Sequence, residues 1–404
     1  MLYDAIIIGA GAAGLMAACS ASQCGKKVLV LESNDKPGLK ILISGGGRCN
    51  FTNLNIDAQN YVSKNPHFCK SALNQFTQND FISMVKSADI PYYEKTLGQL
   101  FCKHSSKQVL SMLLQTAVKQ GVQIKTNVKI ETVSKSLHSI HDLPCVIPAD
   151  SSLRGAQRRG NPGFPIDSGL PRSLRSLAMT NINNDTAEQP RFTITTTAQD
   201  YNCKNIIIAT GGLSYPQLGA SDFGYRLAKE FGHNITTLTP ALDGLVFSNK
   251  EKNCFEGLAG ISLNASVHVE KTSFTENILF THVGLSGPAI LKASLFWQKG
   301  KPIKIDFMPQ ISDFPNWAEG IQSQQPKKLL STVLATQFSI RLVTAILNMI
   351  HVKDKQIANT SKEDWQKLKQ ALKDFTFTPK STVGYKNAEV TRGGIDTKDI
   401  SSKT

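Results

Sequence analysis

One short segment near the amino terminus limits the folds open to this chain more than any other feature. The apolar run Tyr3 to Ile8 passes directly into Gly9-Ala10-Gly11-Ala12-Ala13-Gly14, and small residues then continue to Cys24-Gly25. This order predicts a buried strand, a tight turn and a helix that ends at Gly25. The run Lys27 to Leu31 predicts a second buried strand, so residues 1–32 form a βαβ unit of a parallel sheet.

Each glycine of that turn has a mechanical role. Gly9 permits the tight turn, Gly11 lets a pyrophosphate approach the backbone, and Gly14 lets helix and strand pack closely. Glu32 ends the second strand and can accept hydrogen bonds from an adenosine ribose, which disfavours a 2′-phosphate. Strand, helix and acidic residue fall in register, so the segment predicts a site for FAD or NAD and not for NADP. Glycines with a purely structural role are the alternative.

A second glycine-rich segment lies at Ser44-Gly45-Gly46-Gly47-Arg48-Cys49-Asn50. Its backbone can lie against a planar ring or a diphosphate, with hydrogen-bond donors beside it. A flexible surface loop is the alternative. That alternative fits poorly because Ile41-Leu42-Ile43 precedes the segment and Phe51-Thr52-Asn53 follows it.

Apolar periodicity predicts further elements on both sides of an irregular stretch. Helices are expected at Asn74–Ala88 and Lys107–Gln120, and strands at Val122–Val133, Arg191–Thr197 and Lys204–Ala209. Later in the chain, strands are expected at Ser262–Val269 and Pro302–Phe307, followed by a helix-rich stretch from Pro326 to Phe375. The fold class is therefore α/β.

These elements predict one domain interrupted by another. Residues 1–143 and 191–212, completed by about 381–404, form the nucleotide-binding domain, and residues 213–380 form an inserted substrate domain. Residues 144–190 contain five arginines among Gly, Pro and Ser, and we expect a disordered basic insertion. This segment is either an RNA-attracting arm or, as we favour, a tolerated insertion.

Composition narrows the class of protein. A 404-residue chain with 41% hydrophobic residues is globular, and its net charge of +14 favours a polyanion such as nucleic acid. The eight cysteines are scattered with no metal-ligand spacing, so we expect a reducing compartment and no metal. No segment reads as a signal peptide or a membrane span, which predicts a cytoplasmic location. The oligomeric state is left open.

Four segments carry a resemblance to a known family. They are the run KILISGGGRCNFTN that begins at Lys40, Ala209–Pro216, Leu279–Leu291 and Ala388–Ile395. Together with the first glycine turn they resemble, in order and over nearly the whole chain, the BaiN/RdsA family of FAD-dependent oxidoreductases. The resemblance implies an FAD-binding Rossmann-like domain of the two-dinucleotide-binding type with an inserted domain that is β-barrel-like and then helical.

The resemblance also implies roles for individual residues. The turn from Gly9 to Gly14 faces the pyrophosphate and Glu32 the ribose, while the Val128 backbone lies toward adenine. Lys40 and the Ser44 to Asn50 loop lie toward the flavin, and Thr210, Gly211 and Gly212 form a second turn near the nucleotide. The full set implied to bind FAD is Gly9, Gly11, Ala12, Ala13, Gly14, Glu32, Lys40, Ser44, Gly45, Gly46, Gly47, Arg48, Cys49, Asn50, Val128, Thr210, Gly211 and Gly212.

Members of this family are associated with the reduction of activated carbon–carbon double bonds, in steroid-like acids or in a uracil of large-subunit ribosomal RNA. NAD(P)H is the implied electron donor, and the positive charge favours RNA over a small molecule. Cys49, His282 and Tyr215 are the candidate catalytic residues. We expect Arg48 to lower the pKa of Cys49. An inert buried cysteine and a hydrogen-bonded structural histidine are the alternatives.

The sequence departs from the family pattern in two places. Leu39 stands where a basic residue is usual. Relatives continue past Gly393-Gly394-Ile395 into a strand of the type GLYFAGE and a glycine-rich turn, which this sequence does not contain. We therefore expect an open sheet edge beside Lys204–Ala209 and fewer contacts to the flavin ring. An RNA-binding protein or a truncated, non-functional flavoenzyme is the alternative function.

Overall fold

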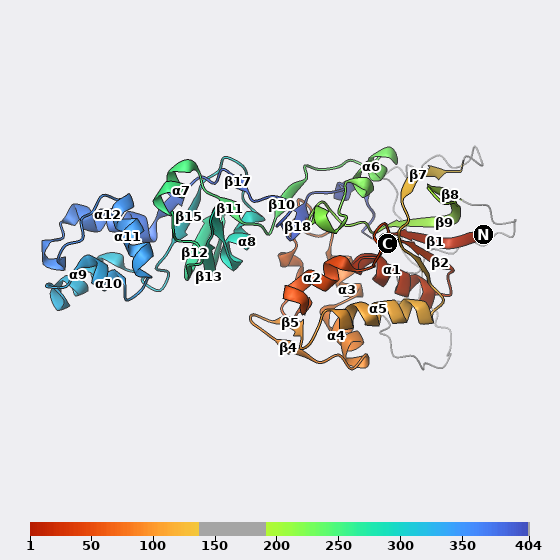
Figure 1. The fold of residues 1–404 in the computed structure, drawn as a ribbon, viewed down its shortest axis with the longest axis horizontal. Helices are drawn as coiled ribbons and strands as arrows, with labels where there is room; N and C mark the ends of the chain where they lie inside the picture. Colours follow the sequence, from red (N-terminus) through yellow and green to blue (C-terminus); the bar gives the residue numbers. More distant parts are fainter. Residues whose placement is uncertain (137–190, 403–404) are drawn as a thin grey trace, which may run out of the picture. The chain divides into compact units, whose positions relative to one another are not determined.

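The computed structural model describes residues 1–136 and 191–402, which form two compact units (Figure 1). One unit comprises Met1–Gly211 together with the segment from Thr397 onward, and the other comprises Gly212–Asp396. The expected disordered insertion, residues 144–190, lies outside the described residues. Each unit is described by itself below.

The first unit is built on a six-stranded mixed sheet. Its strand order is β6-β2-β1-β9-β8-β7, parallel from β6 to β9 and antiparallel from β9 to β7. The strands are β1 (Leu2–Ile8), β2 (Val28–Leu31), β6 (Gln123–Lys125), β7 (Ile130–Lys135), β8 (Phe192–Thr196) and β9 (Asp200–Ile208). All four residues of β2 are buried, as expected of a strand covered on both faces. The predicted βαβ unit is confirmed.

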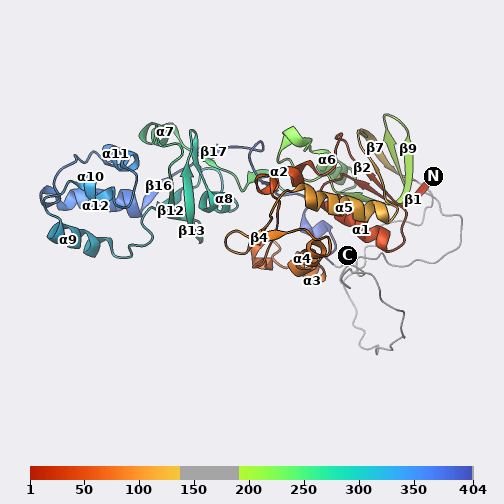
Figure 2. The ribbon, with the colours of Figure 1, turned by 60° about the horizontal axis from the view of Figure 1, so that its bottom comes forward.

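Helices follow several of these strands in the first unit. They are α1 (Ala12–Gln23), α2 (Leu39–Gly47), α3 (Lys70–Gln75), α4 (Gln78–Ser87) and α5 (Lys107–Lys119). The helix α5 runs alongside α1 (Figure 2), and the two contribute Leu15, Ala18 and Leu113 to one apolar core with the sheet. The helix expected over Lys107–Gln120 is thus confirmed.

Two predicted elements are each divided in the structure. The helix expected at Asn74–Ala88 is α3 followed by α4, because Thr77 caps α4 in a reciprocal pair with Asp80. The strand expected at Val122–Val133 is β6 followed by β7. The chain turns between them at Asn127, whose φ of 57° is incompatible with an extended strand.

A small antiparallel sheet follows the triple-glycine segment. It consists of β3 (Asn50–Asn53), β5 (Gln99–Cys102) and β4 (Tyr92–Glu94), in the order β3-β5-β4. Phe51 packs edge-on against Tyr92. Asn50 therefore begins a strand and does not continue the loop.

Strand β9 has one partly open edge. It pairs with β1 from Asn202 to Ile208, whereas β8 pairs only with Asp200 to Cys203. Among the described strands, none pairs with Asn205 to Ile208 on the side away from β1, and Ile208 is 42% exposed. The expected open edge is present.

The second unit contains an antiparallel sheet with the strand order β16-β15-β12-β13-β14-β11-β17. The strands are β11 (Leu245–Val246), β12 (Ser262–Val269), β13 (Thr272–Phe280), β14 (Gly284–Ser286), β15 (Ile303–Asp306), β16 (Phe375–Phe377) and β17 (Ser381–Thr382). Contacting rings of Phe247, Phe255, Phe280 and Phe375 fill its core. A separate strand pair joins β10 (Thr239–Ala241) to β18 (Val390–Arg392). The stretch 381–396 thus lies in the second unit, although the sequence assigned it to the first.

The second unit also contains helices. They are α6 (Phe223–Glu230), α7 (Asn249–Cys254), α8 (Pro288–Ser294), α9 (Phe314–Gln324), α10 (Leu330–Leu334), α11 (Ile340–Met349) and α12 (Lys362–Lys373). The helix-rich stretch expected from Pro326 to Phe375 is confirmed. No helix within residues 1–136 and 191–402 is long and apolar enough to span a membrane.

Candidate functional site

The turn after β1 requires glycine at two positions. Gly9 has a φ of 104°, and a Cβ there would lie 2.5 Å from the carbonyl oxygen of Ala209. A Cβ on Gly14 would lie 1.9 Å from the carbonyl oxygen of Gly9. No side chain can occupy either space, so these two glycines set the tight turn and the close packing of α1 on it, as the sequence predicts.

Gly11 differs from its two neighbours. A Cβ there would have no atom of the described chain within 4 Å, and its φ of −79° suits any residue. It is the N-cap of α1, and no side chain caps that helix. The first N–H groups of α1 have no partner within the helix, and a helix N-terminus of this kind suits a phosphate. This cradle fits the pyrophosphate of a dinucleotide.

Glu32 lies beside the same turn. It is only 7% exposed, and its carboxylate accepts hydrogen bonds from the backbone N of Ala10 at 2.7 Å and of Asn34 at 2.9 Å. Val128 donates its backbone N–H to the carbonyl oxygen of Glu32 at 2.9 Å. The structure therefore places Glu32 and Val128 together at the carboxyl end of β2, which is where the residues expected to contact ribose and adenine should lie.

The triple-glycine loop is held on one side and open on the other. Helical geometry in α2 ends at Ser44, and Gly45, Gly46 and Gly47 all have positive φ. A Cβ on Gly45 would lie 2.7 Å from the Asn50 N, whereas a Cβ on Gly46 or Gly47 would meet nothing within 4 Å.

Backbone hydrogen bonds fix this loop at both ends and in its middle. Cys49 N donates to Ser44 O at 3.0 Å, Ser106 N to Gly47 O at 2.8 Å, and Cys102 N to Arg48 O at 2.9 Å. A loop fixed in this way is not the flexible surface loop of the alternative interpretation. Its open glycine face suits a planar ring or a diphosphate. Lys40 is exposed on the first turn of α2, which leads into the loop.

A second turn lies next to the first. The backbone N of Ala209 donates to Ile8 O at 2.8 Å, so Thr210 and Gly211 leave β9 beside the point where Gly9 leaves β1. Gly211 has a φ of 74° and open space around its Cα. In the sheet, β2 and β9 lie on opposite sides of β1. Such a switch point at the carboxyl ends of parallel strands is where nucleotides bind in open α/β sheets.

In the second unit, Thr391 fixes the continuation of that turn. Its Oγ1 accepts hydrogen bonds from the backbone N of Leu213 at 2.8 Å and of Ser214 at 3.2 Å. It also lies 2.5 Å from where a Cβ on Gly212 would stand. Sequence reasoning did not include Thr391 among the site residues. The one signal was its position within the family-like segment Ala388–Ile395.

Tyr215 follows in a left-handed conformation with a φ of 64°. Its backbone N donates to Tyr385 O at 2.9 Å. Burial raises the pKa of its phenol, and the nearby carboxylates of Glu389 and Asp243 raise it further. The hydroxyl therefore stays protonated at neutral pH and can act as a donor.

Asp243 is a buried carboxylate near Tyr215 that sequence reasoning missed. It is 1% exposed and accepts hydrogen bonds from the backbone N of Gly244 at 2.8 Å and of Gly384 at 2.6 Å. Burial raises its pKa, although these hydrogen bonds oppose that shift. A single aspartate between Leu242 and Gly244 gave no pattern that could have indicated this role.

His282 lies away from Tyr215. It is exposed at the turn between β13 and β14, and its side chain makes no hydrogen bond to any described residue, so the alternative of a hydrogen-bonded structural histidine is wrong. The backbone O of its neighbour Val283 accepts a hydrogen bond from the N of Phe247, which directly follows β11. Asp243, by contrast, lies just before the start of β11. About four residues of extended chain, roughly 13 Å, separate these two ends.

Cys49 belongs to the first unit, and its surroundings contradict one expectation. It is 6% exposed, and burial raises the pKa of its thiol, only partly offset by a hydrogen bond with Ser44. Arg48 instead donates to the Tyr93 hydroxyl at 3.3 Å. The expectation that Arg48 lowers the pKa of Cys49 is therefore wrong, because burial decides the shift. A neutral thiol remains able to donate a proton.

Within the part of the chain that the structure describes, no group of three His, Cys, Asp or Glu side chains is placed to hold a metal ion. The polar groups of the site are instead backbone N–H groups, a carboxylate, a thiol and hydroxyls. Such a donor set suits an organic cofactor and its phosphates more than a cation.

Comparisons with known proteins match both units. The model of the HI0933-like protein Rossmann domain matches residues 3–146, and that of the HI0933-like protein barrel and H2TH domain matches residues 239–390. The chain is 37% identical over its whole length to a protein of Escherichia coli named ribosomal RNA dihydrouridine synthase, of which it covers 88%. It is 38% identical over 99% of its length to a Haemophilus influenzae protein of the same name, of which it covers 87%.

A more distant relative has a different substrate in its name. It is the 3-dehydro-bile acid delta(4,6)-reductase of Clostridium scindens, 27% identical over 98% of this chain and 87% of its own. Among solved structures, a flavocytochrome c3 fumarate reductase covers 86% of this chain and 61% of its own at 13% identity, with a TM-score of 0.35. A TM-score this low carries no argument, so the assignment rests on the sequence relatives and the family models. The chain belongs to the HI0933-like family, the BaiN/RdsA family that its motifs resemble, and is an FAD-dependent oxidoreductase.

Proposed function

We propose that this protein uses bound FAD to reduce the C5=C6 double bond of a uracil in large-subunit ribosomal RNA, with NAD(P)H as the electron donor. The observation that carries the proposal is the pair of open glycine faces, at Gly11 and at Gly46-Gly47, in a turn and a loop that are otherwise fixed by packing and hydrogen bonds. The names of the two relatives above 35% identity support the substrate, and the net charge of +14 favours RNA over a bile acid.

The residues of this chain divide the work. Gly11, Ala12, Ala13 and Gly14 offer N–H groups to the pyrophosphate, and Glu32 accepts from the ribose. The loop from Ser44 to Cys49, with Asn50 at the start of β3, holds the ring. When bound, FAD supplies the hydride for the double bond. Reduction also needs one proton, and we assign its delivery to the protonated thiol of Cys49, which lies two residues after Gly47.

Tyr215 and His282 are the remaining candidates for contact with the substrate. The Tyr215 phenol is kept protonated by burial and by nearby carboxylates, so it can donate a hydrogen bond to a uracil carbonyl. His282 is exposed and makes no side-chain hydrogen bond to a described residue, which leaves both ring nitrogens available.

The test uses the purified full chain. We expect a yellow protein whose blue absorbance is bleached anaerobically by NADH or NADPH and restored by ribosomal RNA that lacks dihydrouridine, with dihydrouridine appearing in that RNA. Bleaching followed by restoration with a 3-oxo-bile acid but not with RNA would overturn the substrate. Colourless protein that cannot be reconstituted with FAD would favour the alternative, an RNA-binding protein without flavin chemistry.

A further inference from the structure

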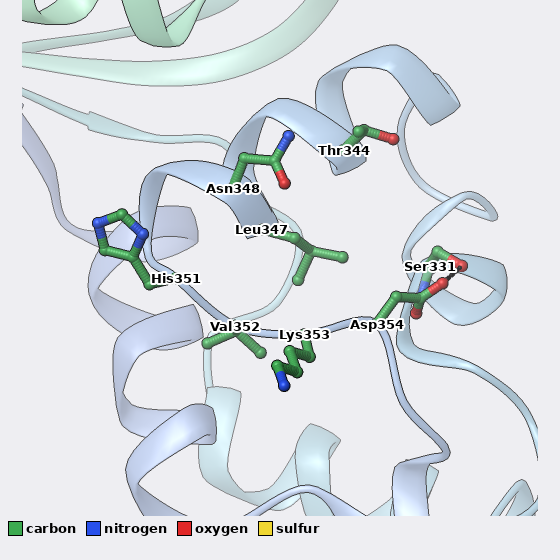
Figure 3. Close-up of a pocket in the computed structure, with 8 residues that line it drawn as sticks. All are labelled: Ser331, Thr344, Leu347, Asn348, His351, Val352, Lys353 and Asp354. Atoms are coloured by element: carbon green, nitrogen blue, oxygen red, sulfur yellow. Dashed lines mark hydrogen bonds between the residues drawn. The ribbon is translucent and has the colours of Figure 1, made fainter.

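We infer that the helical part of the second unit carries a binding pocket for the sugar-phosphate backbone of an RNA strand. A pocket of about 600 Å³ opens between α10, α11 and the loop that follows α11. Figure 3 shows Leu347 facing this hollow, between Asn348, Val352 and Asp354. A volume of this size is in the range that holds a nucleotide-sized group.

The polar lining of the pocket is available to a ligand. Lys353 contributes a positive charge and His351 an imidazole, and Thr344 and Asn348 contribute a hydroxyl and an amide. All four are exposed, and none of their side chains forms a hydrogen bond or ion pair with another described residue. A phosphate suits the Lys353 ammonium and the imidazole N–H of His351, and a ribose hydroxyl or a base edge suits the other two.

The one acidic side chain in the lining is already satisfied. Asp354 accepts hydrogen bonds from the backbone N of Ser331 at 2.9 Å and from its hydroxyl at 2.6 Å. These bonds hold the loop against the start of α10. The carboxylate of Asp354 therefore forms part of the pocket wall, and both of its oxygens already accept a hydrogen bond from Ser331.

Further positive charge continues from this loop. Leu330 N donates to Lys355 O and Ile357 N to Lys328 O, so the segment that contains Lys327 and Lys328 runs beside the loop after Lys353. Lys327 and Lys328 are exposed and form no ion pair with a described residue, whereas Lys355 pairs with Asp364. Residues 311–380 contain ten Lys and Arg against six Asp and Glu. Lysines without ion pairs to described residues, on segments that adjoin a polar pocket, are complementary to a polyanionic strand.

His351 allows a test that does not damage the fold. It follows α11 with a φ of 55°, where Val352 N donates to Leu347 O and His351 N to Asn348 O. A helix terminus of this kind favours glycine. The substitution His351→Gly therefore removes the imidazole and relieves backbone strain at once, so weaker binding cannot be ascribed to unfolding.

The inference rests on the proposed function only in the choice of RNA as the polyanion. The experiment measures binding of a fluorescein-labelled single-stranded RNA of mixed sequence to the full chain over a salt series. We expect H351G/K353Q to bind about ten-fold more weakly and to show a shallower salt dependence, by about 0.7 in log–log slope per lost phosphate contact. Lys271→Gln, which removes an exposed cation from the turn between β12 and β13, is the matched control and should bind as the wild type does.

The outcomes separate this inference from the proposed reaction. RNA binding that is equal in the wild type and in H351G/K353Q overturns the pocket, while flavin bleaching and dihydrouridine formation in the wild type continue to test the reaction. A wild type that binds vesicles containing phosphatidylglycerol but no RNA overturns the pocket in favour of a membrane surface. A loss in Lys271→Gln as large as that in H351G/K353Q also overturns it, because binding then depends on total charge alone.

Discussion

At the residue scale, the glycines of the first turn separate folding from cofactor binding. Gly11→Ala adds a methyl group to open space at an ordinary φ, so we expect the melting temperature of the apoprotein to change little. The same methyl group occupies the space through which a pyrophosphate approaches. FAD affinity, measured by flavin fluorescence titration, should therefore fall at least ten-fold.

Gly14→Ala is the contrasting change. The new Cβ would lie 1.9 Å from the Gly9 carbonyl oxygen, and the turn or the start of α1 has to shift to admit it. We expect a loss of about 1–3 kcal/mol in the free energy of unfolding of the apoprotein, in line with overpacking elsewhere. Equal stability of the Gly11→Ala and Gly14→Ala apoproteins in urea would contradict this distinction.

Asp243 should make stability depend on pH in an unusual direction for a carboxylate. Its pKa is raised in the folded protein above the ordinary value of 3.8, so the folded state holds this proton more tightly than the unfolded state does. The stabilisation from its protonated form is complete below that ordinary value and declines as pH rises through the folded pKa.

The comparison with Asp243→Asn isolates the contribution of Asp243 protonation to the free energy of unfolding, because asparagine does not titrate. We expect the free energy of unfolding of the wild type, minus that of the variant, to decrease as pH rises from about 3.8 into the range of the raised pKa. Urea unfolding at a series of pH values measures it. A difference that increases with pH would contradict the raised pKa.

At the element scale, one lysine ties α12 to the sheet of the second unit. The Nζ of Lys373 donates to Asp306 Oδ2 at 2.6 Å and to the carbonyl oxygens of Met308 and Ile311 at 2.7 and 2.6 Å. Its side chain and that of Asp306 are both largely buried. We expect Lys373→Ala to lower the free energy of unfolding by about 2–4 kcal/mol, because the carboxylate and two carbonyls lose their donor.

Lys369, one turn earlier on the same helix, is the matched control. It is exposed and makes no ion pair to a described residue, so Lys369→Ala should change the free energy of unfolding by less than about 0.5 kcal/mol. Thermal and urea unfolding of the two variants give the comparison. Similar losses in both would mean that charge on α12, and not the contacts of Lys373, sets the stability.

Sequence reasoning found the elements whose signals are local. The glycine spacing of the first turn, the apolar run of β1, the small residues of α1 and the apolar period of α5 each lie within one short stretch, and all were predicted. The division between α3 and α4 depends on the reciprocal cap of Thr77 and Asp80, which a longer apolar period obscured. The position of β18 in the second unit could not be predicted, because its pairing with β10 joins residues that are far apart in the chain.

The same reasoning applies to the candidate site. The sequence predicted the roles of Gly9, Gly11, Gly14 and Glu32 because these residues occur at the fixed spacing of a dinucleotide-binding turn. Thr391 and Asp243 were not, since each acts by hydrogen bonds to backbone groups that only the fold brings near. The pKa of Cys49 was misjudged for a related reason. A neighbouring arginine is visible in sequence, whereas the burial that outweighs it is not.

At the scale of the whole molecule, the strands β7 and β8 determine how residues 137–190 are attached. The two strands pair from Ile130 opposite Thr196 to Lys135 opposite Phe192, and Ser136 N then donates to Arg191 O at 2.9 Å. The chain therefore enters and leaves that segment at one point. Replacing residues 137–190 with Asn-Gly, a pair suited to a tight hairpin turn, should retain FAD binding and the melting transition.

This variant also tests where RNA binds. If the basic insertion is the RNA contact, its removal should abolish RNA binding and flatten the salt dependence. If the pocket beside α11 is the contact, RNA binding should persist and remain sensitive to His351→Gly and Lys353→Gln. Loss of FAD from the variant would instead mean that the segment supports the first unit.

The pairing of β7 with β8 at the two ends of residues 137–190 has an evolutionary consequence. Once two strands clamp the ends of a segment, doubling its length adds only about 0.6 kcal/mol of loop-closure entropy. The stability of the fold then depends little on the sequence between Ser136 and Arg191. Insertions, deletions and substitutions are therefore tolerated at this position without disturbing the sheet. Related chains should therefore differ most in length here, and a tag or reporter domain placed at this hairpin should leave the enzyme intact.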